Sequence, residues 1–253
     1  MAIKINIKKN IPNKLIKNHV FFTDEDFKIN GLKYLNLGKD AELIKSSIKS
    51  LNSNKKDFLY FNLNPFSKIT IVKIINSKDT INNEKIGAKF YDFIKSNSIF
   101  FLTFNEKNIT HTQGNNKIFF DEFLHGVNLK SYIFDKYKTK KDKNNFQIDI
   151  LTKKHFKINQ DKRFNSILEG IKFTKDLVSE PGNILHPDEY AKRLKQLTKF
   201  GLKVVIYDEK KLRKLKMNAL LGVGQGSIRG SYLVTLEWNG LKKNKKPLAF
   251  VGK

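Results

Sequence analysis

The sequence contains no cysteine, which excludes disulfides, thiolate metal sites and cysteine nucleophiles. The lack of disulfides suits a reducing compartment such as the cytosol. Long apolar runs are also missing from the first ten residues, Met1 to Asn10, so this segment provides neither a signal-peptide core nor a membrane span. We therefore expect a cytoplasmic protein with no membrane partner.

Acidic residues are scarce: 24 Asp plus Glu accompany 49 Lys plus Arg, which gives a formal net charge of +25. Such a charge attracts nucleic acid, anionic membranes or acidic substrates. Lysine, asparagine, isoleucine and phenylalanine are abundant together, as expected for a coding sequence rich in A and T. Because the basic residues are spread along the chain without an Arg-rich or aromatic-interleaved stripe, we favour this compositional origin. A non-catalytic protein that contacts nucleic acid is the second hypothesis.

Apolar residues fall in patterned runs, which indicate packed sheets and helices. In the first part of the chain, apolar runs predict strands, and apolar spacings of three and four predict helices. A polar loop containing His111 and Gly114 is expected before residue 117. The expected strands are 2–7, 32–37, 58–63, 68–74, 99–104 and an edge strand at 146–150, and the expected helices are 40–51, 84–96 and 117–132.

The second part of the chain has clearer helix signals. A long connecting helix is expected over 161–179, ended by Pro181-Gly182, and a second helix begins at Pro187 and stops at Gly201. Short strands are expected over 202–207, 231–238 and 247–251, with a basic helical segment over 208–215. Strands alternate with helices in both parts, so we predict an α/β protein of two units divided between residues 155 and 180.

Several familiar site motifs are missing. The glycine-rich stretch Ala219 to Ser227 fits neither the dinucleotide fingerprint nor the phosphate-binding loop, so we favour a packing role for its glycines. None of the histidines forms a pair at helical metal-binding spacing: His19, His111, His125, His155 and His186. Ser227 and Ser231 lie near glycines, but no nucleophile-elbow motif surrounds either of them. The residues alone therefore favour no nucleotide, zinc-helix or serine-hydrolase chemistry.

Three ordered segments resemble the leucine (cytosol) aminopeptidase family. They are Asp176 to Pro187 (DLVSEPGNILHP), Met217 to Ser227 with its Gly-Val-Gly-Gln-Gly-Ser turn, and the final Phe250-Val251-Gly252-Lys253. Weaker similarity begins at Phe123-Leu124-His125-Gly126 and extends the resemblance over most of the chain. Ser179 departs from the family pattern, which commonly has Asn at that place.

The resemblance implies an architecture that agrees with the pattern analysis. It consists of a macro-like amino-terminal α/β domain over 1–158, a linking helix over 159–180, and the start of a catalytic α/β domain with a mixed sheet over 181–253. On this interpretation, Pro247 to Val251 form a buried strand that leads to Gly252-Lys253. Ligand sites of open α/β sheets lie beyond the carboxyl ends of strands, so we expect the chain to be an enzyme fragment that stops where its chemistry begins.

The resemblance also implies the reaction, which is removal of amino-terminal residues from peptides by a leucyl aminopeptidase with two divalent metal ions, manganese or zinc. Lys253 matches the family's lysine metal ligand; otherwise, it is simply a charged residue at a strand end. The family's other ligands and its catalytic Lys and Arg lie downstream of this strand, so the chain alone is expected to be inactive. Peptide substrates and a homo-hexamer are implied for the complete protein.

Overall fold

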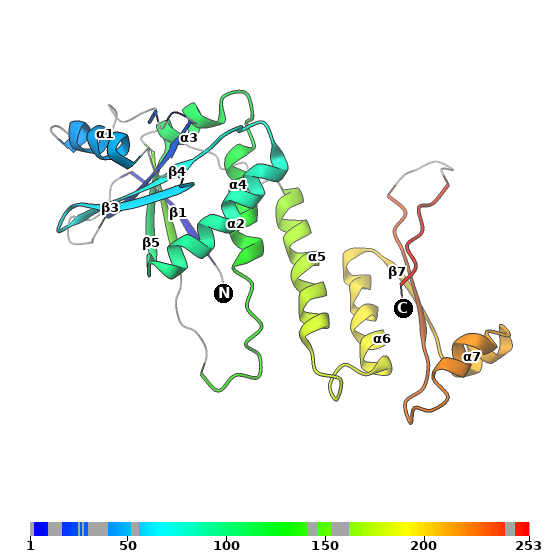
Figure 1. Ribbon diagram of the computed structural model, residues 1–253. Coiled ribbons are helices and arrows are strands. Elements are labelled where there is room, and N and C mark those ends of the chain that lie inside the picture. The colour runs from blue at the N-terminus through cyan, green and yellow to red at the C-terminus, as the bar shows by residue number, and fades with distance from the viewer. Residues whose placement is uncertain are drawn as a thin grey trace. The chain divides into compact units, whose positions relative to one another are not determined.

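The computed structural model describes residues 3–9, 17–24, 26, 28–29, 40–51, 56–140, 146–152, 162–240 and 246–252. The chain divides into two compact units, Met1–Phe173 and Thr174–Lys253, which are described separately below (Figure 1). No helix in the described ranges is both long enough and apolar enough to span a membrane.

The first unit is built on a six-stranded mixed sheet with the order β1-β6-β5-β2-β4-β3. Neighbouring strands run parallel except at the β3–β4 hairpin, which is antiparallel. The strands are β1 (Lys4–Lys8), β2 (Lys17–Thr23), β3 (Phe58–Asn64), β4 (Ser67–Lys73), β5 (Phe101–Asn105) and β6 (Gln147–Leu151).

Helices pack on both faces of this sheet. Helices α2 (Thr80–Ser96) and α4 (Phe119–Lys130) share a core with Val20 and Phe22 of β2. Helix α1 (Asp40–Leu51) packs on the opposite face with Phe21, because successive side chains of a strand point to opposite sides. Helix α3 (Glu106–Gln113) follows β5 directly. Strand β2 is therefore buried on both faces, as expected of a central strand in an α/β sheet.

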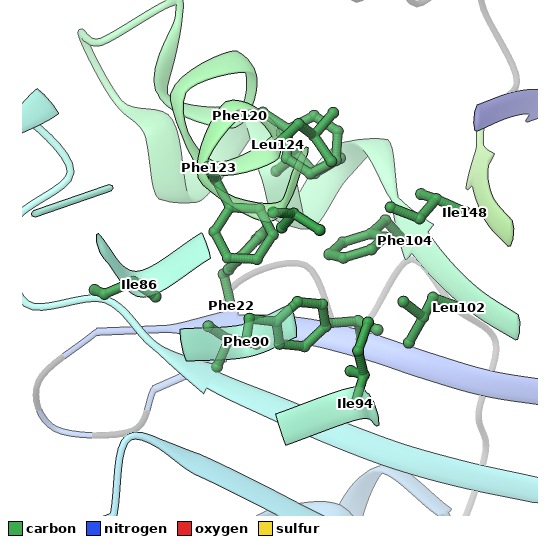
Figure 2. Packing of buried hydrophobic residues seen from close by; sticks show 14 of the residues in the cluster. Phe22, Ile86, Phe90, Ile94, Leu102, Phe104, Phe120, Phe123, Leu124 and Ile148 are labelled. Atoms are coloured by element: carbon green, nitrogen blue, oxygen red, sulfur yellow. The ribbon is translucent and has the colours of Figure 1, made fainter. Parts of the chain in front are cut away.

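Phenylalanine rings dominate the larger core (Figure 2). The fully buried Phe22 ring lies 5.2 Å from Phe119 and 5.0 Å from Phe123, measured between centroids, and both contacts are edge-on. Phe104 lies 5.6 Å from Phe22 in a tilted arrangement. Edge-to-face packing brings the positive ring edge toward the negative ring face, which adds to the free energy of burial. This cluster fixes α4 against the centre of the sheet.

Most expected elements of the first unit are confirmed, including helix 40–51, the 58–63 and 68–74 hairpin, a helix that covers 84–96 but begins at Thr80, and a helix within 117–132. Two expectations are wrong and one strand was missed. The expected edge strand at 146–150 is the internal strand β6, the expected polar loop around His111 is mostly helix α3, and strand β2 was not predicted. The strand expected at 32–37 lies outside the described residues.

The second unit follows the predicted order closely. Helix α5 (Lys162–Ser179) contains the division between the units. It precedes α6 (Pro187–Lys195) and the 3₁₀ helix η3 (Gln196–Phe200), which ends at the left-handed Gly201 (φ +87°) as expected. The remaining elements are β7 (Lys203–Tyr207), α7 (Glu209–Lys214), α8 (Asn218–Val223) and β8 (Leu233–Glu237), with β7 and β8 paired antiparallel.

The buried strand expected at 247–251 is not observed. Within the described residues 246–252 the chain has no regular secondary structure, and Leu248, Phe250 and Val251 are 82%, 89% and 98% exposed. An apolar segment of this kind becomes a strand only when a neighbouring strand accepts its hydrogen bonds. The described pairings of β7 and β8 involve only each other.

Candidate functional site

The segment that follows α5 is held by a partly buried ion network. Glu180 is almost fully buried at its side chain, 2% exposed, and its Oε1 accepts a 2.8 Å hydrogen bond from Arg193 of α6. Arg193 also donates from Nε to Glu189 at 3.0 Å. The hydrogen bonds to Glu180 and Glu189 raise the pKa of Arg193 above its ordinary value. The Glu180 carboxylate therefore fixes the turn at Pro181 to α6 and is not free for acid–base chemistry.

The same turn is closed by its backbone. The Pro181 carbonyl accepts the N–H groups of Ile184 and Leu185, both at 2.9 Å. Pro187 occupies the first turn of α6, where its missing N–H costs no helix hydrogen bond. These contacts agree with the expectation that Pro181-Gly182 ends the connecting helix, because α5 stops at Ser179.

A second polar cluster lies at the start of α6. The His186 ring nitrogen Nδ1 contacts Asp188 Oδ1, and Arg229 reaches Asp188 Oδ2 at 3.4 Å. Desolvation alone raises the pKa of Asp188, but the hydrogen bonds of its own N–H and of His186, together with the charges of His186 and Arg229, lower it overall. This cluster connects the beginning of α6 to the loop after the glycine-rich turn.

The glycine-rich stretch forms α8 and a succession of tight turns. Gly224 approaches Ser231 so closely that a Cβ atom there would lie 2.1 Å from Ser231 Oγ. The Ser227 N–H donates back to the Gly224 carbonyl at 3.0 Å, and its hydroxyl accepts the Arg229 N–H at 3.0 Å. In these contacts, polar groups of the stretch form hydrogen bonds with neighbouring groups in the same loop. They therefore support the packing role expected from the sequence.

The described histidines lie on different elements. His19 lies in β2, His111 in α3, His125 is buried in α4, and His186 is paired with Asp188. His155 lies outside the described residues, as does Lys253, the expected metal ligand. Across the described ranges, no three His, Asp or Glu side chains gather as a metal ion would require. The described residues therefore do not fit a bimetal centre by themselves.

The sequence analysis missed two contributors to this region, Arg193 and Arg229. The spacing of Glu189 and Arg193, four residues apart on a helix, was a readable signal for an ion pair. The contacts from Arg193 to Glu180 and from Arg229 to Asp188 span 13 and 41 residues, so they depend on the tertiary fold.

Comparison with known proteins assigns this region. Residues 172–253 match the family model described as "Cytosol aminopeptidase family, catalytic domain". A probable cytosol aminopeptidase of Phytoplasma mali (strain AT) is 37% identical over 229 residues, which cover 85% of this chain. Another, of Wolbachia pipientis wMel, is 34% identical over an alignment of 263 positions that covers 100% of this chain. The chain belongs to the cytosol aminopeptidase family.

This family member spans about half the length of its curated relatives, 44% of the Phytoplasma protein and 50% of the Wolbachia protein. Solved structures agree with the fold. A mutant of tomato leucine aminopeptidase superposes with a TM-score of 0.71 at 20% identity, over 96% of this chain and 52% of that one. The bottromycin maturation enzyme BotP, in complex with Mn, gives a TM-score of 0.60 at 15% identity, over 88% of this chain and 45% of that one.

Proposed function

We propose that this family member contributes the amino-terminal half of a cytoplasmic, metal-dependent leucyl aminopeptidase that removes amino-terminal residues from peptides. The observation that carries the proposal is the match of residues 172–253 to the family's catalytic-domain model. Its three motif segments occur in family order within that range. On this proposal, residues 1–158 are the macro-like domain, residues 159–180 the linking helix, and residues 181–253 the start of the catalytic domain.

Lys253 is the residue of this chain that we assign to the metal centre. Its amine must be neutral to coordinate a metal ion, and a nearby dication favours that state by lowering the pKa of the amine. Two divalent ions, manganese or zinc, would polarise the scissile carbonyl and activate water when bound. The chain spans about half the length of its relatives, and we assign the other ligands to the half of the family's length that it does not cover.

On this assignment, the ion network around Glu180 holds the turn at Pro181 in place and takes no part in the reaction. Arg193 bridges Glu180 and Glu189, so the turn at Pro181 is held beside α6. We also assign peptide substrates and a homo-hexameric assembly to the complete protein.

A fusion of this chain to the carboxyl-terminal half of the Phytoplasma relative tests the assignment of Lys253. The fusion should hydrolyse L-leucine p-nitroanilide only with Mn²⁺ or Zn²⁺ present. Lys253→Met should abolish turnover and lower the number of bound metal ions measured by mass spectrometry. Lys246→Met, which changes an exposed lysine on the same segment, is the matched control and should keep both. Full activity of the Lys253→Met fusion would contradict the assignment.

A further inference from the structure

Helix α7 of the second unit carries a cluster of unpaired cations (Figure 1, orange). Lys210, Arg213, Lys214 and Lys216 are all exposed, and none of their side chains has a hydrogen bond or ion pair with another described residue. Lys211, also exposed, donates from Nζ to the Ile206 carbonyl at 3.2 Å. Residues 210–216 thus hold five basic side chains without one acidic residue.

The two carboxylates that precede this cluster are engaged by backbone groups. Asp208 accepts the Lys211 N–H at 3.0 Å and caps the helix. Glu209 accepts the Ser231 N–H at 3.1 Å. Both side chains serve local structure, and the described chain contains no ion pair between them and the cations of α7.

The geometry of α7 gathers the cations on one side. Leu212 is fully buried and fixes the inward face of the helix. Lys210, Arg213 and Lys214 are spaced by three and four residues, which places them next to one another on the helix surface. Like charges at this spacing repel one another, whereas the carboxyl end of the helix dipole favours cations in the last turn, where Arg213 and Lys214 lie.

Lys216 adds a cation at a position where the backbone favours glycine. Helix α7 ends in a Schellman motif, in which Met217 N–H donates to the Leu212 carbonyl and Lys216 N–H to the Arg213 carbonyl, both at 3.0 Å. Lys216 has φ +56°, in the left-handed region where residues with a Cβ are strained. Lysine at position 216 is therefore less stable than glycine would be there.

We propose that the α7 cluster, defined as Lys210, Arg213, Lys214 and Lys216, binds the phosphate backbone of nucleic acid. The helical part of the cluster, Lys210 to Lys214, extends along about 6 Å of helix at about 1.5 Å per residue, and Lys216 follows it. Duplex DNA carries one negative charge per about 1.7 Å of its axis, so it can neutralise several of these cations at once. Such binding releases counterions, needs no particular base sequence, and weakens as salt rises.

The test measures binding of the 253-residue chain to a fluorescent DNA duplex of mixed sequence by anisotropy, over a series of salt concentrations. The α7 variant carries Lys210→Gln, Arg213→Gln, Lys214→Gln and Lys216→Gln. It should bind at least about tenfold more weakly near 0.1 M salt. It should also lower the slope of log affinity against log salt by about 2 to 4, at about 0.9 per lost phosphate contact.

The matched control variant changes four exposed lysines at separate positions in the first unit, Lys9, Lys49, Lys85 and Lys117, to glutamine. It has the same net charge as the α7 variant and should keep most of the affinity. Equal losses in the two variants would show attraction by overall charge and would overturn the proposal. Binding to phosphatidylserine vesicles without binding to DNA would also overturn it, because it would assign the cluster to a membrane surface.

A single substitution separates binding from folding. Lys216→Gly removes both the charge and the backbone strain, so it should raise the Tm by about 2 to 5 °C and still weaken DNA binding. The control is Ser98→Gly, because Ser98 occupies the same position in the Schellman motif after α2, with φ +53°. It should raise the Tm alone. Unchanged DNA affinity of Lys216→Gly would remove Lys216 from the proposed cluster and contradict the proposal.

Discussion

Asp149 lies in the internal strand β6 and is largely buried. Lys8 donates to it at 2.6 Å, Asn6 at 2.7 Å and Gln147 at 2.9 Å. Burial alone raises the pKa of Asp149, but these hydrogen bonds and the Lys8 charge outweigh it and hold the pKa below its ordinary value. The carboxylate therefore stabilises the fold above the unfolded pKa, and this contribution is lost as pH falls through the folded pKa.

A double-mutant cycle with Lys8→Met and Asp149→Asn should give a coupling free energy of about 1.5 to 3 kcal/mol, since the hydrogen bond is charge-assisted and shielded from water. The control pair is Lys130 and Asp92, at 3.0 Å but about half exposed at both side chains. Its coupling should stay below about 1 kcal/mol. Urea unfolding of all variants provides the coupling free energies. Similar values for the two pairs would show that burial does not strengthen the Lys8–Asp149 pair.

His125 is buried in α4, with its ring 5.0 Å from the Phe164 ring. Desolvation lowers its pKa, and the charge of Glu84 opposes this only in part. The folded state therefore binds a proton less readily than the unfolded state. Stability should be unaffected by this group above the unfolded pKa of about 6.5 and should fall as pH drops below it.

The expected loss from His125 is at most about 1.4 kcal/mol per pH unit, because one proton is involved. Urea unfolding at several pH values between about 7 and 5 measures it. His125→Phe should flatten the curve, whereas His111→Phe, at an exposed position, should leave the slope nearly unchanged. Parallel curves for wild type and His125→Phe would show that His125 is not the titrating group.

At the scale of elements, two glycines allow α2 and α4 to approach closely. A Cβ on Gly87 would lie 2.0 Å from the Phe123 carbonyl oxygen, and one on Gly126 would lie 2.0 Å from the Glu84 carbonyl oxygen. Both obstacles are backbone atoms, so they cannot move without separating the helices. The close contact also brings Glu122 of α4, fully buried, within reach of donors near the start of α2.

Gly87→Ala and Gly126→Ala should each lower the free energy of unfolding by about 1 to 3 kcal/mol or more, through overpacking. Gly170→Ala is the control, since Gly170 lies within α5 and has open space around its Cβ position. It should stabilise the protein by about 0.5 to 1 kcal/mol through helix propensity. Thermal melts followed by circular dichroism measure all three, and tolerance of alanine at position 87 or 126 would disprove the close packing.

Sequence patterns predicted the elements whose apolar period is regular. Strand β2 was not predicted because its first half, Lys17 to His19, is polar. In addition, Phe21 and Phe22 are buried on opposite faces, so apolar and polar residues do not alternate. Strand β6 was taken for an edge strand because Gln147 and Asp149 alternate with apolar residues. Its polar positions are internal because neighbouring side chains satisfy the carboxylate of Asp149. The pattern of apolar and polar residues within one strand does not reveal such partners on a neighbouring strand.

At the scale of the whole molecule, the sequence predicted two α/β units and a division between 155 and 180. The structure divides after Phe173, within α5. The domain boundaries at 158 and 180 stay predictions, as does the role of Lys253. The site itself could be predicted only through the resemblance, because metal ligands that are distant in sequence have no local spacing rule. The ion contacts of Arg193 and Arg229 likewise became visible only in the fold.

The most direct measurement of the central claim compares the purified 253-residue chain with its fusion to the carboxyl-terminal half of the Phytoplasma relative. Both are assayed for hydrolysis of L-leucine p-nitroanilide with added Mn²⁺ or Zn²⁺, and again with a chelator. The account predicts metal-dependent turnover by the fusion and none by the 253-residue chain. Turnover by the 253-residue chain that the chelator abolishes would contradict it, because a complete metal site would then lie within these residues.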